Sequence, residues 1–328
     1  MNKSFIDIVS TGTLEEVQKA IKSGANVNEQ DSDEFTPLMH AAGNNKNPDV
    51  IKALIEAGSD VDYSTSEGLT PLMIATCDNQ NPEVIMVLIN EGSDVIDYML
   101  TTAAANNQNP KVVISLINAG ADVNECLDSG TTPLMAAASY NQNPEMITAL
   151  IKAGSNINDQ DSNGMTPFMH AARDNKNPEV IMTLVKAGAK VNECSSEGNT
   201  PLMIAADKNE NPEVVTALIN AGANINDLDS FNRTPLMFAA HDNPNPKVIT
   251  TLIKKGANVN EKDSDGLTPL MLAAINNQNP EVITILLKSG ADGKLKDNEG
   301  KTAFDYAKDN EHIKGATAYQ ELKDAQYK

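Results

Sequence analysis

The 328-residue sequence has no tryptophan, only two arginines, only three cysteines and no long run of apolar residues. Because no apolar run reaches the length of a signal peptide or a membrane-spanning helix, we expect no membrane association. Basic residues are also scarce, with 25 Lys and Arg against 45 Asp and Glu, a net charge of −20. A nucleic-acid binder needs a basic stripe to displace counterions, so we expect no nucleic-acid partner.

The motifs of common enzymes are missing as well. The sequence contains no H-E-x-x-H, G-x-S-x-G, P-loop or paired C-x-x-C motif. The four histidines, His40, His170, His241 and His312, are too scattered to predict a metal cluster. Repeated acidic residues fall at helix starts and turns, where capping explains them. We therefore predict that the protein is not an enzyme and has no catalytic residue, metal or cofactor.

What the sequence does contain is a unit of 34 residues that recurs along nearly the whole chain. A fixed period of this length predicts a solenoid. Each unit is too small to bury an apolar face alone, so neighbouring units must stack and present a long surface. The clearest marker is Thr-Pro followed by Leu-Met or Phe-Met, beginning at Thr36, Thr70, Thr132, Thr166, Thr200, Thr234 and Thr268.

One unit shows how the others are expected to fold. The Thr-Pro step at 36–37 predicts the start of a short helix, with proline at the first helical position. Asn45, which recurs in every unit, is expected to end this helix in the left-handed conformation. The Asn-Pro step at 47–48 predicts the start of a second helix and Gly58 its end. The polar segment 60–68 is expected to project as a hairpin-like finger.

Tetratricopeptide repeats have the same period, so the residues must decide between the two families. Tetratricopeptide signatures contain tryptophan, whereas this chain has none and shows T-P-L-x-x-A-A followed by G-A-x-V-N, as at 222–226. This pattern resembles the ankyrin repeat, lengthened by one residue between its helices, over residues 5 to 320. The resemblance implies an all-α solenoid of stacked helix-turn-helix units with β-hairpin-like fingers. Methionine replaces the histidine of the family's T-P-L-H, and apolar packing is expected to compensate for the lost hydrogen bond.

The regular register predicts a single array at 1–328, with an N-terminal capping unit at 1–30, eight repeats at 31–297 and a C-terminal capping unit at 298–328. The third repeat is shortened, because Pro82 and Pro110 are 28 residues apart instead of 34. The missing residues fall between Gly92 and Tyr98, so one finger is expected to be reduced or absent. We expect the groove to be interrupted there, and a partner to contact the longer run that follows.

The negative charge is concentrated on the repeats. Residues 286–328 contain 8 Lys and 8 acidic residues, so the preceding residues hold the whole excess. Such a surface attracts a basic protein partner by electrostatic steering, although it also simply keeps a long solenoid soluble. Cys126 and Cys194 are equivalent positions two repeats apart, too distant for a disulfide, so we expect reduced thiols and a cytoplasmic setting. We also expect a monomer. Removal of a leader, or export as an effector, stays open as an alternative.

Positions that vary between units predict where a partner binds. Two residues after each Ala-Ala pair change from unit to unit, as does the residue before each Thr-Pro. In ankyrin repeats these positions face the concave groove and the finger tips. Both arginines fall there, and arginine and tyrosine are prominent in interface energetics. The predicted contact residues are Tyr140, Arg173, Asp174, Asp207, Lys208, Phe231, Arg233, His241 and Asp242.

We therefore predict a non-catalytic scaffold that binds a protein partner through the groove and finger tips. An inhibitor or immunity-type protein that blocks a partner enzyme would have the same surface chemistry and is the alternative. A mechanical spacer would have uniformly small, polar variable positions, which Tyr140, Phe238 and Ile275 do not match. An enzyme with an unfamiliar site would need a pocket with perturbed titrating groups, which an open groove does not favour. Phe35 and Phe231 either contact a partner or fold onto their own fingers.

Overall fold

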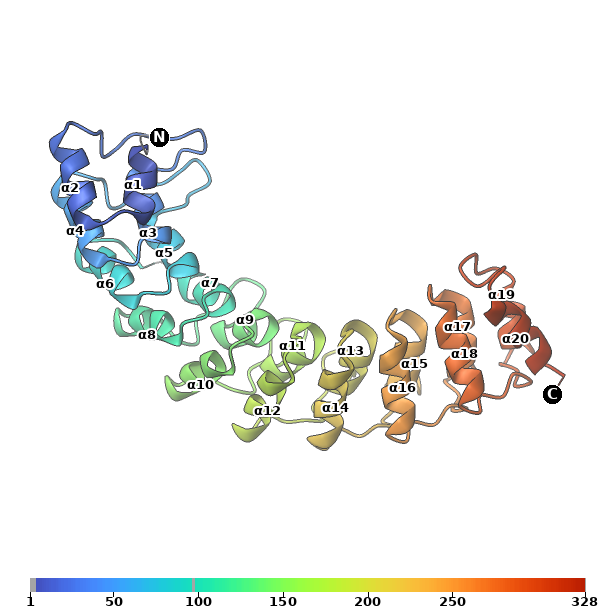
Figure 1. The fold of residues 1–328 in the computed structure, drawn as a ribbon. Coiled ribbons are helices and arrows are strands. Elements are labelled where there is room, and N and C mark those ends of the chain that lie inside the picture. The colour runs from blue at the N-terminus through green and yellow to red at the C-terminus, as the bar shows by residue number, and fades with distance from the viewer. Residues whose placement is uncertain (1–3, 96–97, 328) are drawn as a thin grey trace. The chain divides into compact units, whose positions relative to one another are not determined.

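The computed structural model describes residues 4–95 and 98–327, and twenty helices lie within these two stretches (Figure 1). No β-strand occurs among the described residues, which confirms the predicted all-α class. The chain divides into two compact units, Met1–Asn156 and Ile157–Lys328. The prediction of one array over 1–328 stays a prediction.

The first unit contains five helix pairs that stack in chain order (Figure 1). The first helix of each pair contacts the first helix of the next, and the second helices contact one another in the same way. The first helices are α1 (Phe5–Thr11), α3 (Pro37–Asn44), α5 (Pro71–Asp78), α7 (Tyr98–Asn106) and α9 (Pro133–Tyr140). The second helices are α2 (Leu14–Lys22), α4 (Pro48–Glu56), α6 (Pro82–Asn90), α8 (Pro110–Asn118) and α10 (Pro144–Lys152).

The second unit repeats this arrangement with five further pairs. Its first helices are α11 (Pro167–Asp174), α13 (Pro201–Lys208), α15 (Pro235–Asp242), α17 (Pro269–Asn276) and α19 (Ala303–Ala307). Its second helices are α12 (Pro178–Lys186), α14 (Pro212–Asn220), α16 (Pro246–Lys254), α18 (Pro280–Lys288) and α20 (Thr317–Ala325). In a typical pair, α15 and α16 completely bury Leu236, Ala239, Ala240, Ile249 and Leu252. The small alanines allow neighbouring first helices to approach closely.

The helix boundaries follow the predicted capping chemistry. Thr234 Oγ1 accepts the Met237 N–H at 3.3 Å, with Pro235 at the first helical position of α15. Asn245 is the N-cap of α16, and its Oδ1 accepts the Lys247 N–H at 3.0 Å. The same Thr-Pro and Asn-Pro starts recur in most pairs, so the predicted helix starts are confirmed.

Gly58 ends α4 as expected. Its φ of 95° lies in the left-handed region, which glycine adopts without a steric penalty. The Gly58 N–H donates to Ile55 O at 2.9 Å, and the Ser59 N–H donates to Leu54 O at 3.0 Å. These two bonds form a Schellman motif, which satisfies the last carbonyl groups of the helix.

The recurring asparagine does cap the first helices, but not in the predicted left-handed conformation. Asn277, at the end of α17, has φ −64° and ψ 132°, which is extended backbone. Its buried Nδ2 donates to Ala240 O at 2.9 Å and Asn243 O at 3.1 Å in the preceding pair, while its Oδ1 accepts the Asn279 N–H at 2.9 Å. The left-handed prediction is wrong because this side chain bridges two repeats, a contact that a single repeat does not reveal.

This bridge recurs within each unit and forms a buried ladder, called here the asparagine ladder. Each member donates its Nδ2 hydrogens to carbonyl oxygens of the preceding pair. The members whose bonds stay within one unit are Asn45, Asn79, Asn107, Asn141, Asn209, Asn243, Asn277 and Asn310.

The methionines that replace histidine are buried, but packing is not their whole contribution. Met237 Sδ accepts the backbone N–H of the N-cap Thr234 at 3.4 Å, and Met203 and Met271 do the same for their own caps at 3.5 Å. From the sequence, the hydrogen bond of the replaced histidine is expected to be lost. A weak sulfur hydrogen bond instead completes the cap in these repeats.

The fingers are tight turns that contact one another. In one finger the Asp161 N–H donates to Met165 O at 3.0 Å, and the Gly164 N–H donates to Asp161 O at 2.9 Å. A Cβ on Gly164 would lie 2.7 Å from the backbone nitrogen of Ser196 in the next finger, so glycine permits this approach. The reduced third finger was predicted between Gly92 and Tyr98, and residues 96–97 of that segment lie outside the described residues.

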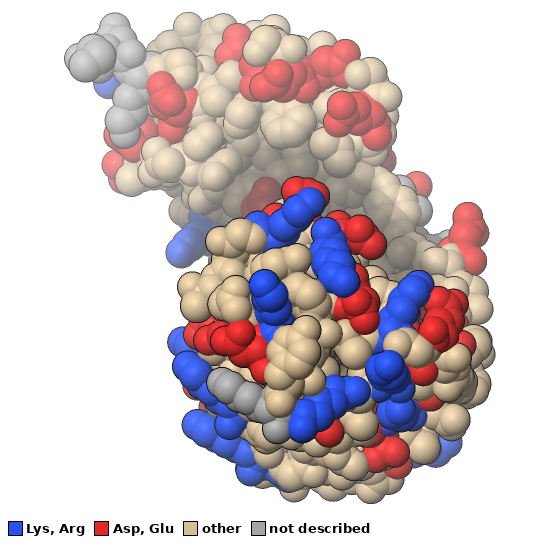
Figure 2. All heavy atoms as spheres, turned by 90° about the vertical axis from the view of Figure 1, so that its right-hand side faces the viewer, with Lys and Arg blue, Asp and Glu red and all other residues tan. Residues whose placement is uncertain are grey.

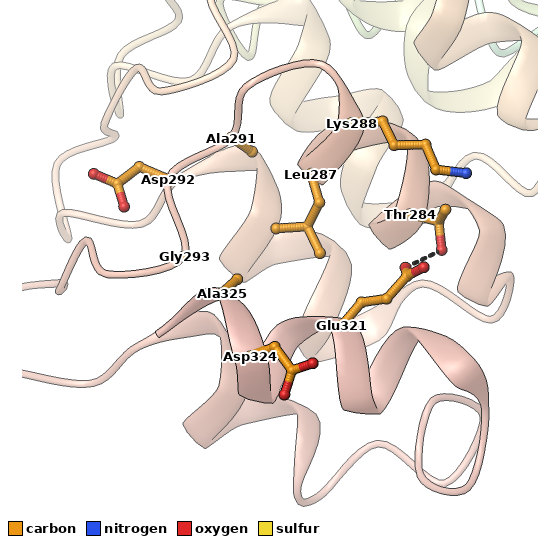
Figure 3. A pocket seen from close by; sticks show the side chains of 9 residues that line it. All are labelled: Thr284, Leu287, Lys288, Ala291, Asp292, Gly293, Glu321, Asp324 and Ala325. Carbon is orange, nitrogen blue, oxygen red and sulfur yellow. Dashed lines mark hydrogen bonds between the residues drawn. The ribbon is translucent and has the colours of Figure 1, made fainter. Parts of the chain in front are cut away.

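The C-terminal pair caps the second unit. Viewed from the side of the C-terminal helices, basic and acidic side chains intermingle on the near surface (Figure 2). Helix α20 packs on α18, where Thr284 Oγ1 donates to Glu321 beside a cleft of about 380 Å³ (Figure 3). Gly293 lies so close to Ala325 that a Cβ would come within 2.6 Å of it. None of the described helices is long and apolar enough to cross a membrane.

Candidate functional site

A hollow of about 500 Å³ lies in the second unit, between three successive fingers and helices α13, α15 and α17. Buried Met237 and Leu272 give it an apolar floor. Phe231 also lines the hollow, and this side chain is 60% exposed. The acidic side chains that line it are Glu197, Asp207, Asp242, Asp263 and Asp265.

Arg233 in this hollow is held by one carboxylate and two aromatic rings. Its Nε and Nη2 atoms both lie 2.7 Å from Asp229 Oδ2. Its guanidinium carbon lies 4.5 Å from the ring centre of Phe238 and 5.3 Å from that of Phe231, as in cation–π contacts. The Asp229 side chain is only 1% exposed, and its Oδ1 accepts the backbone N–H groups of Phe231 and Arg233. The charge of Arg233 is therefore balanced within its own finger.

Two other carboxylates are less well compensated. Burial raises the pKa of Asp207, although Lys208 Nζ at 3.2 Å opposes the shift. Burial also raises the pKa of Asp263, whose Oδ1 accepts the backbone N–H groups of Asp265 at 3.0 Å and Leu267 at 2.8 Å. Desolvation disfavours the charged form of a carboxyl group unless a cation lies close by. The hollow is therefore a place where an added positive charge would be stabilised.

Asp242 behaves differently because it has local partners. His241 Nδ1 lies 2.9 Å from its Oδ2, and Asn276 Nδ2 donates to its Oδ1 at 2.7 Å. Burial favours a higher pKa for Asp242, but the hydrogen bonds and charge of His241, with smaller contributions from Lys208 and Asn276, hold it below the ordinary value. Asp242 is therefore ionised at neutral pH.

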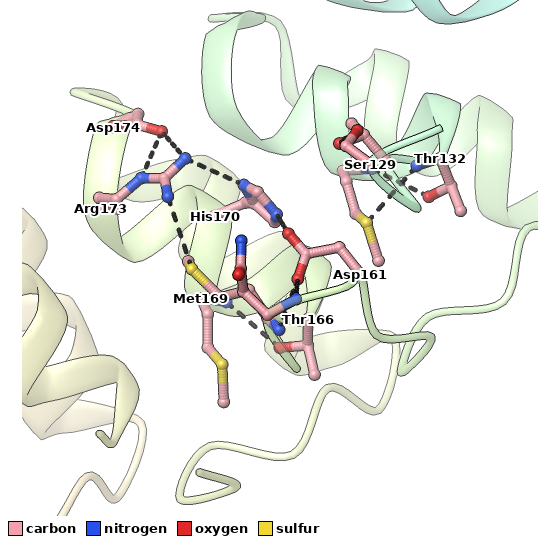
Figure 4. Close-up of polar contacts among 12 residues, drawn as sticks. Ser129, Thr132, Asp161, Thr166, Met169, His170, Arg173 and Asp174 are labelled. Carbon is pink, nitrogen blue, oxygen red and sulfur yellow. Dashed lines mark hydrogen bonds and ion pairs between the residues drawn. The ribbon is translucent and has the colours of Figure 1, made fainter. Parts of the chain in front are cut away.

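Arg173 lies in a separate polar network of the same unit (Figure 4). Its Nε and Nη2 both lie 2.9 Å from Asp174 Oδ2, and its Nη1 lies 3.5 Å from Met165 Sδ. Its Nη2 also lies 3.3 Å from His170 Nδ1, and His170 Nε2 lies 3.0 Å from Asp161 Oδ2. Arg173 is thus tied through His170 to the finger that precedes its own helix.

The network indicates which nitrogen of His170 carries the proton. Arginine can only donate, so Nδ1 accepts from Arg173 and Nε2–H donates to Asp161. Burial, together with the positive charge of Arg173, lowers the pKa of His170, although Asp161 opposes the shift. Burial would raise the pKa of Asp161, but backbone N–H groups and His170 lower it overall. A neutral imidazole between an arginine and an aspartate satisfies both neighbours.

The predicted contact residues separate into groups in the structure. Those that line the hollow are Asp207, Phe231, Arg233, His241 and Asp242. Lys208 pairs with Asp207 beside it, whereas Arg173 and Asp174 belong to the network around His170. Tyr140 lies in the first unit at the end of α9 and is 62% exposed. The ring centres of Phe35 and His40 lie 5.7 Å apart in an edge-on arrangement, so Phe35 packs against the helix that follows its own finger.

Sequence reasoning missed several residues of the hollow. Asp229 and Asp263 occupy the same turn position in successive fingers, and an acid at a turn was interpreted as a cap. That position does bind backbone N–H groups, but in Asp229 the second oxygen also holds Arg233. Phe238 belongs to the helix stripe and was not counted among the variable contact positions. The equivalent residues in the other Thr-Pro repeats are His40, Ile74, Ala136, His170, Ile204 and Leu272, so Phe238 is the only aromatic hydrocarbon ring among them, a difference that could have identified it.

The chemistry of these residues is that of binding. Among the described residues, no group of three or more His, Cys, Asp or Glu side chains has an arrangement that could hold a metal ion. The hollow brings together carboxylate oxygens, aromatic rings and an apolar floor. Such a combination favours ionic and apolar contacts with a group from outside.

The comparison with known families agrees with the stacked pairs and fingers. A protein-family model described as "Ankyrin repeats (3 copies)" matches residues 5–98, 100–193, 168–263 and 236–318. The chain belongs to the ankyrin-repeat family. Ankyrin repeats generally serve as protein–protein interaction modules and are typically non-catalytic. No match was found among curated proteins.

Proposed function

We propose that this ankyrin-repeat protein is a non-catalytic scaffold that binds a protein partner through the groove and finger tips of its second unit. The observation that carries this proposal is the hollow behind Phe231. An exposed aromatic side chain beside a pocket of ligand-binding size is unfavourable in water but provides the contact area on which interfaces depend. The family's general role as an interaction module supports the same conclusion.

The proposal includes a reducing, cytoplasmic setting and a monomeric chain. Cys77, Cys126 and Cys194 are all free thiols, and Cys126 and Cys194 are exposed. Exposed free thiols persist best in a reducing compartment. The acidic repeats would steer a basic partner toward the binding surface, because long-range attraction raises association rates at low ionic strength.

A photocrosslinking experiment tests the proposed surface directly. The crosslinking amino acid p-benzoylphenylalanine replaces Phe231 in the full-length chain, which is then irradiated in lysate from the source cells. The control places the same amino acid at Leu127, a finger residue of the first unit that is 40% exposed. We expect discrete protein adducts at position 231 that are absent at position 127. Adducts of equal yield at both positions, or none at position 231, would contradict the proposed surface.

A further inference from the structure

The finger that carries Phe231 differs from its siblings at the tip. The other fingers have a polar residue at this position, namely Asp33, Glu67, Ser129, Asn163, Glu197, Asp265 and Glu299. An aromatic residue is therefore not needed for the finger to fold. The next residue, Asn232, has a φ of 60°, where most sibling fingers have glycine. Both changes act on the exposed tip and leave the buried caps of α15 unchanged.

Phe231 is flanked by acidic residues of the neighbouring fingers. Glu197 and Asp265 occupy the equivalent tip positions on either side, and both side chains are exposed. The following finger is fixed next to Phe231, because the Ser264 N–H donates to Phe231 O at 2.9 Å. Below the tips, Leu267 and Leu272 contribute apolar surface to the hollow. A bound group would therefore contact hydrocarbon in the hollow and carboxylates around it.

Negative charge exceeds positive charge in and beside this hollow. The carboxylates that line it are Glu197, Asp207, Asp242, Asp263 and Asp265, and Asp229 lies beside it, against the cations Arg233 in the lining and Lys208 next to Asp207. Arg233 is fully engaged with Asp229 and the aromatic rings, so it compensates little of the remainder. The described residues include no ion-pair partner for Asp263.

Hydrogen-bond acceptors are also in excess. Asp207 and Asn199 line the hollow, and the Oδ1 atom of each is buried. Neither oxygen accepts a hydrogen bond from any of the described residues. A buried acceptor without a donor is unfavourable, because it has lost its hydrogen bonds to water without replacement. Guanidinium and ammonium groups supply donors and positive charge together and have no acceptor. An anionic group would instead be repelled by every uncompensated carboxylate.

We propose that the hollow receives one arginine or lysine side chain of the protein partner, with its aliphatic stem against Phe231 and Leu267 and its cationic head among Asp207, Asp242 and Asp263. This assignment depends on the proposed scaffold function and specifies its partner chemistry. The volume of about 500 Å³ falls within the range of about 300–1,000 Å³ that is typical of ligand pockets. Arginine and lysine each have an apolar aliphatic chain that ends in a charged group, so they fit a surface that offers both apolar and carboxylate contacts.

The binding of a cation to this hollow should depend on pH. Burial raises the pKa values of Asp207 and Asp263, so these groups take up protons at a higher pH than ordinary aspartates. The other charged or titratable side chains that line the hollow are Glu197, Arg233, His241, Asp242 and Asp265, and Lys208 pairs with Asp207 beside it. Protonation removes the attraction for the cation, so affinity should fall as the pH is lowered through the raised pKa values.

Nuclear magnetic resonance of the full-length chain tests the assignment. The probes are the peptides acetyl-Ala-Arg-Ala-amide and acetyl-Ala-Lys-Ala-amide, with acetyl-Ala-citrulline-Ala-amide as the neutral control of arginine-like shape. The readout is the ¹³C-methyl resonance of Met237 on the floor, assigned with Met237→Leu. We expect a cationic peptide to shift this resonance in a saturable way, with a dissociation constant at least about tenfold lower than that of the citrulline peptide. Equal shifts with both kinds of peptide, or none, would overturn the assignment.

Variants separate this pocket from the overall charge of the chain. The double variant Asp242→Asn/Asp263→Asn keeps acceptor oxygens for the local N–H donors but removes two negative charges. It should lower the affinity for the cationic peptide about tenfold. Glu67→Gln/Asp128→Asn removes the same charge from exposed positions of the first unit and should leave the affinity unchanged. If both double variants lowered the affinity equally, the net charge of the chain would explain the binding, and the assignment to the hollow would be wrong. Phe231→Ser, the residue at 129, should also weaken binding, with folding verified from the dispersed methyl spectrum.

The two experiments fail in distinguishable ways. Protein adducts at position 231 without a peptide-dependent shift at Met237 would remove the cationic pocket and leave the scaffold proposal standing. A selective Met237 shift without adducts would retain the pocket and contradict the proposed partner surface in that lysate. The absence of both results would remove both proposals.

Discussion

The asparagine ladder and the hollow of the second unit contain the same kinds of polar atom in opposite situations. In the ladder, Asn277 uses two donor bonds and one acceptor bond, and all of them reach backbone groups. In the hollow, the buried Oδ1 atoms of Asp207 and Asn199 have no donor among the described residues. The ladder residue is the same in every repeat, whereas several residues of the hollow, among them Phe231 and Arg233, have no identical counterpart at the equivalent position of another repeat.

This difference separates stability from recognition. In a repeat protein the interface between neighbours supplies much of the folding free energy, so identical bonds at every interface accumulate. Unpaired acceptors and an exposed Phe231 work against folding, and they are tolerated on the finger side because the ladder already holds the repeats together. The comparison predicts that substitutions in the ladder reduce stability, and that substitutions in the hollow mainly reduce binding.

The largest effect is expected from Asn277→Ala. The substitution leaves the carbonyl groups of Ala240 and Asn243 and the N–H of Asn279 without their partners, so we expect a loss of at least about 3 kcal/mol. The neighbouring amide Gln278 is exposed, and Gln278→Ala should cost less than about 0.5 kcal/mol. Urea denaturation followed by circular dichroism measures both, with hydrogen exchange of α15 and α17 as the local readout. Similar losses of unfolding free energy in the two variants would show that the asparagine ladder contributes no more to stability than an exposed amide.

The sequence was sufficient for features that depend on residues close in the chain. Thr-Pro and Asn-Pro starts and the end at Gly58 are local, and all were predicted correctly. The conformation of Asn277 was not predicted correctly, because its hydrogen-bond partners lie in the preceding pair. These hydrogen bonds outweigh the local preference of asparagine for the left-handed conformation. Capping by methionine sulfur was missed for a similar reason, since apolar residues are normally judged by packing alone.

The candidate site was only partly predictable for the same physical reason. Variation between repeats identified Phe231 and Arg233 as exceptional positions of the finger. It could not show that Arg233 is occupied by Asp229, or that Asp263 lacks an ion-pair partner among the described residues, because both depend on three-dimensional distances. Variation between repeats identifies where contacts differ, and the structure shows which charges remain uncompensated.

An intermediate effect is expected from the two arginines, which both lie at variable positions of their repeats but in different surroundings. Arg233→Ala leaves Asp229, whose side chain is 1% exposed, without its cation and should cost about 1–3 kcal/mol. Arg173→Ala should cost less than about 1 kcal/mol, because Asp174 is 28% exposed and water can replace the guanidinium. Parallel urea denaturations give the two values. A greater loss for Arg173→Ala would show that the network around His170, rather than the Asp229 finger, is the more important structural contact.

The smallest effect is a pH dependence that originates at His170. Burial holds its folded-state pKa below the ordinary value of 6.5, so the unfolded chain binds a proton first as the pH falls. Stability therefore rises with pH in this window: the contribution is complete above about 6.5 and declines as the pH falls toward the lowered pKa, by less than about 1.4 kcal/mol per pH unit. His170→Gln should flatten thermal stability between pH 7 and the lowered pKa, whereas His312→Gln, at an exposed position of the C-terminal cap, should retain the slope. If the pH dependence of stability persists in His170→Gln, another group is responsible for it. The network around His170 would then contribute only through its structural contacts.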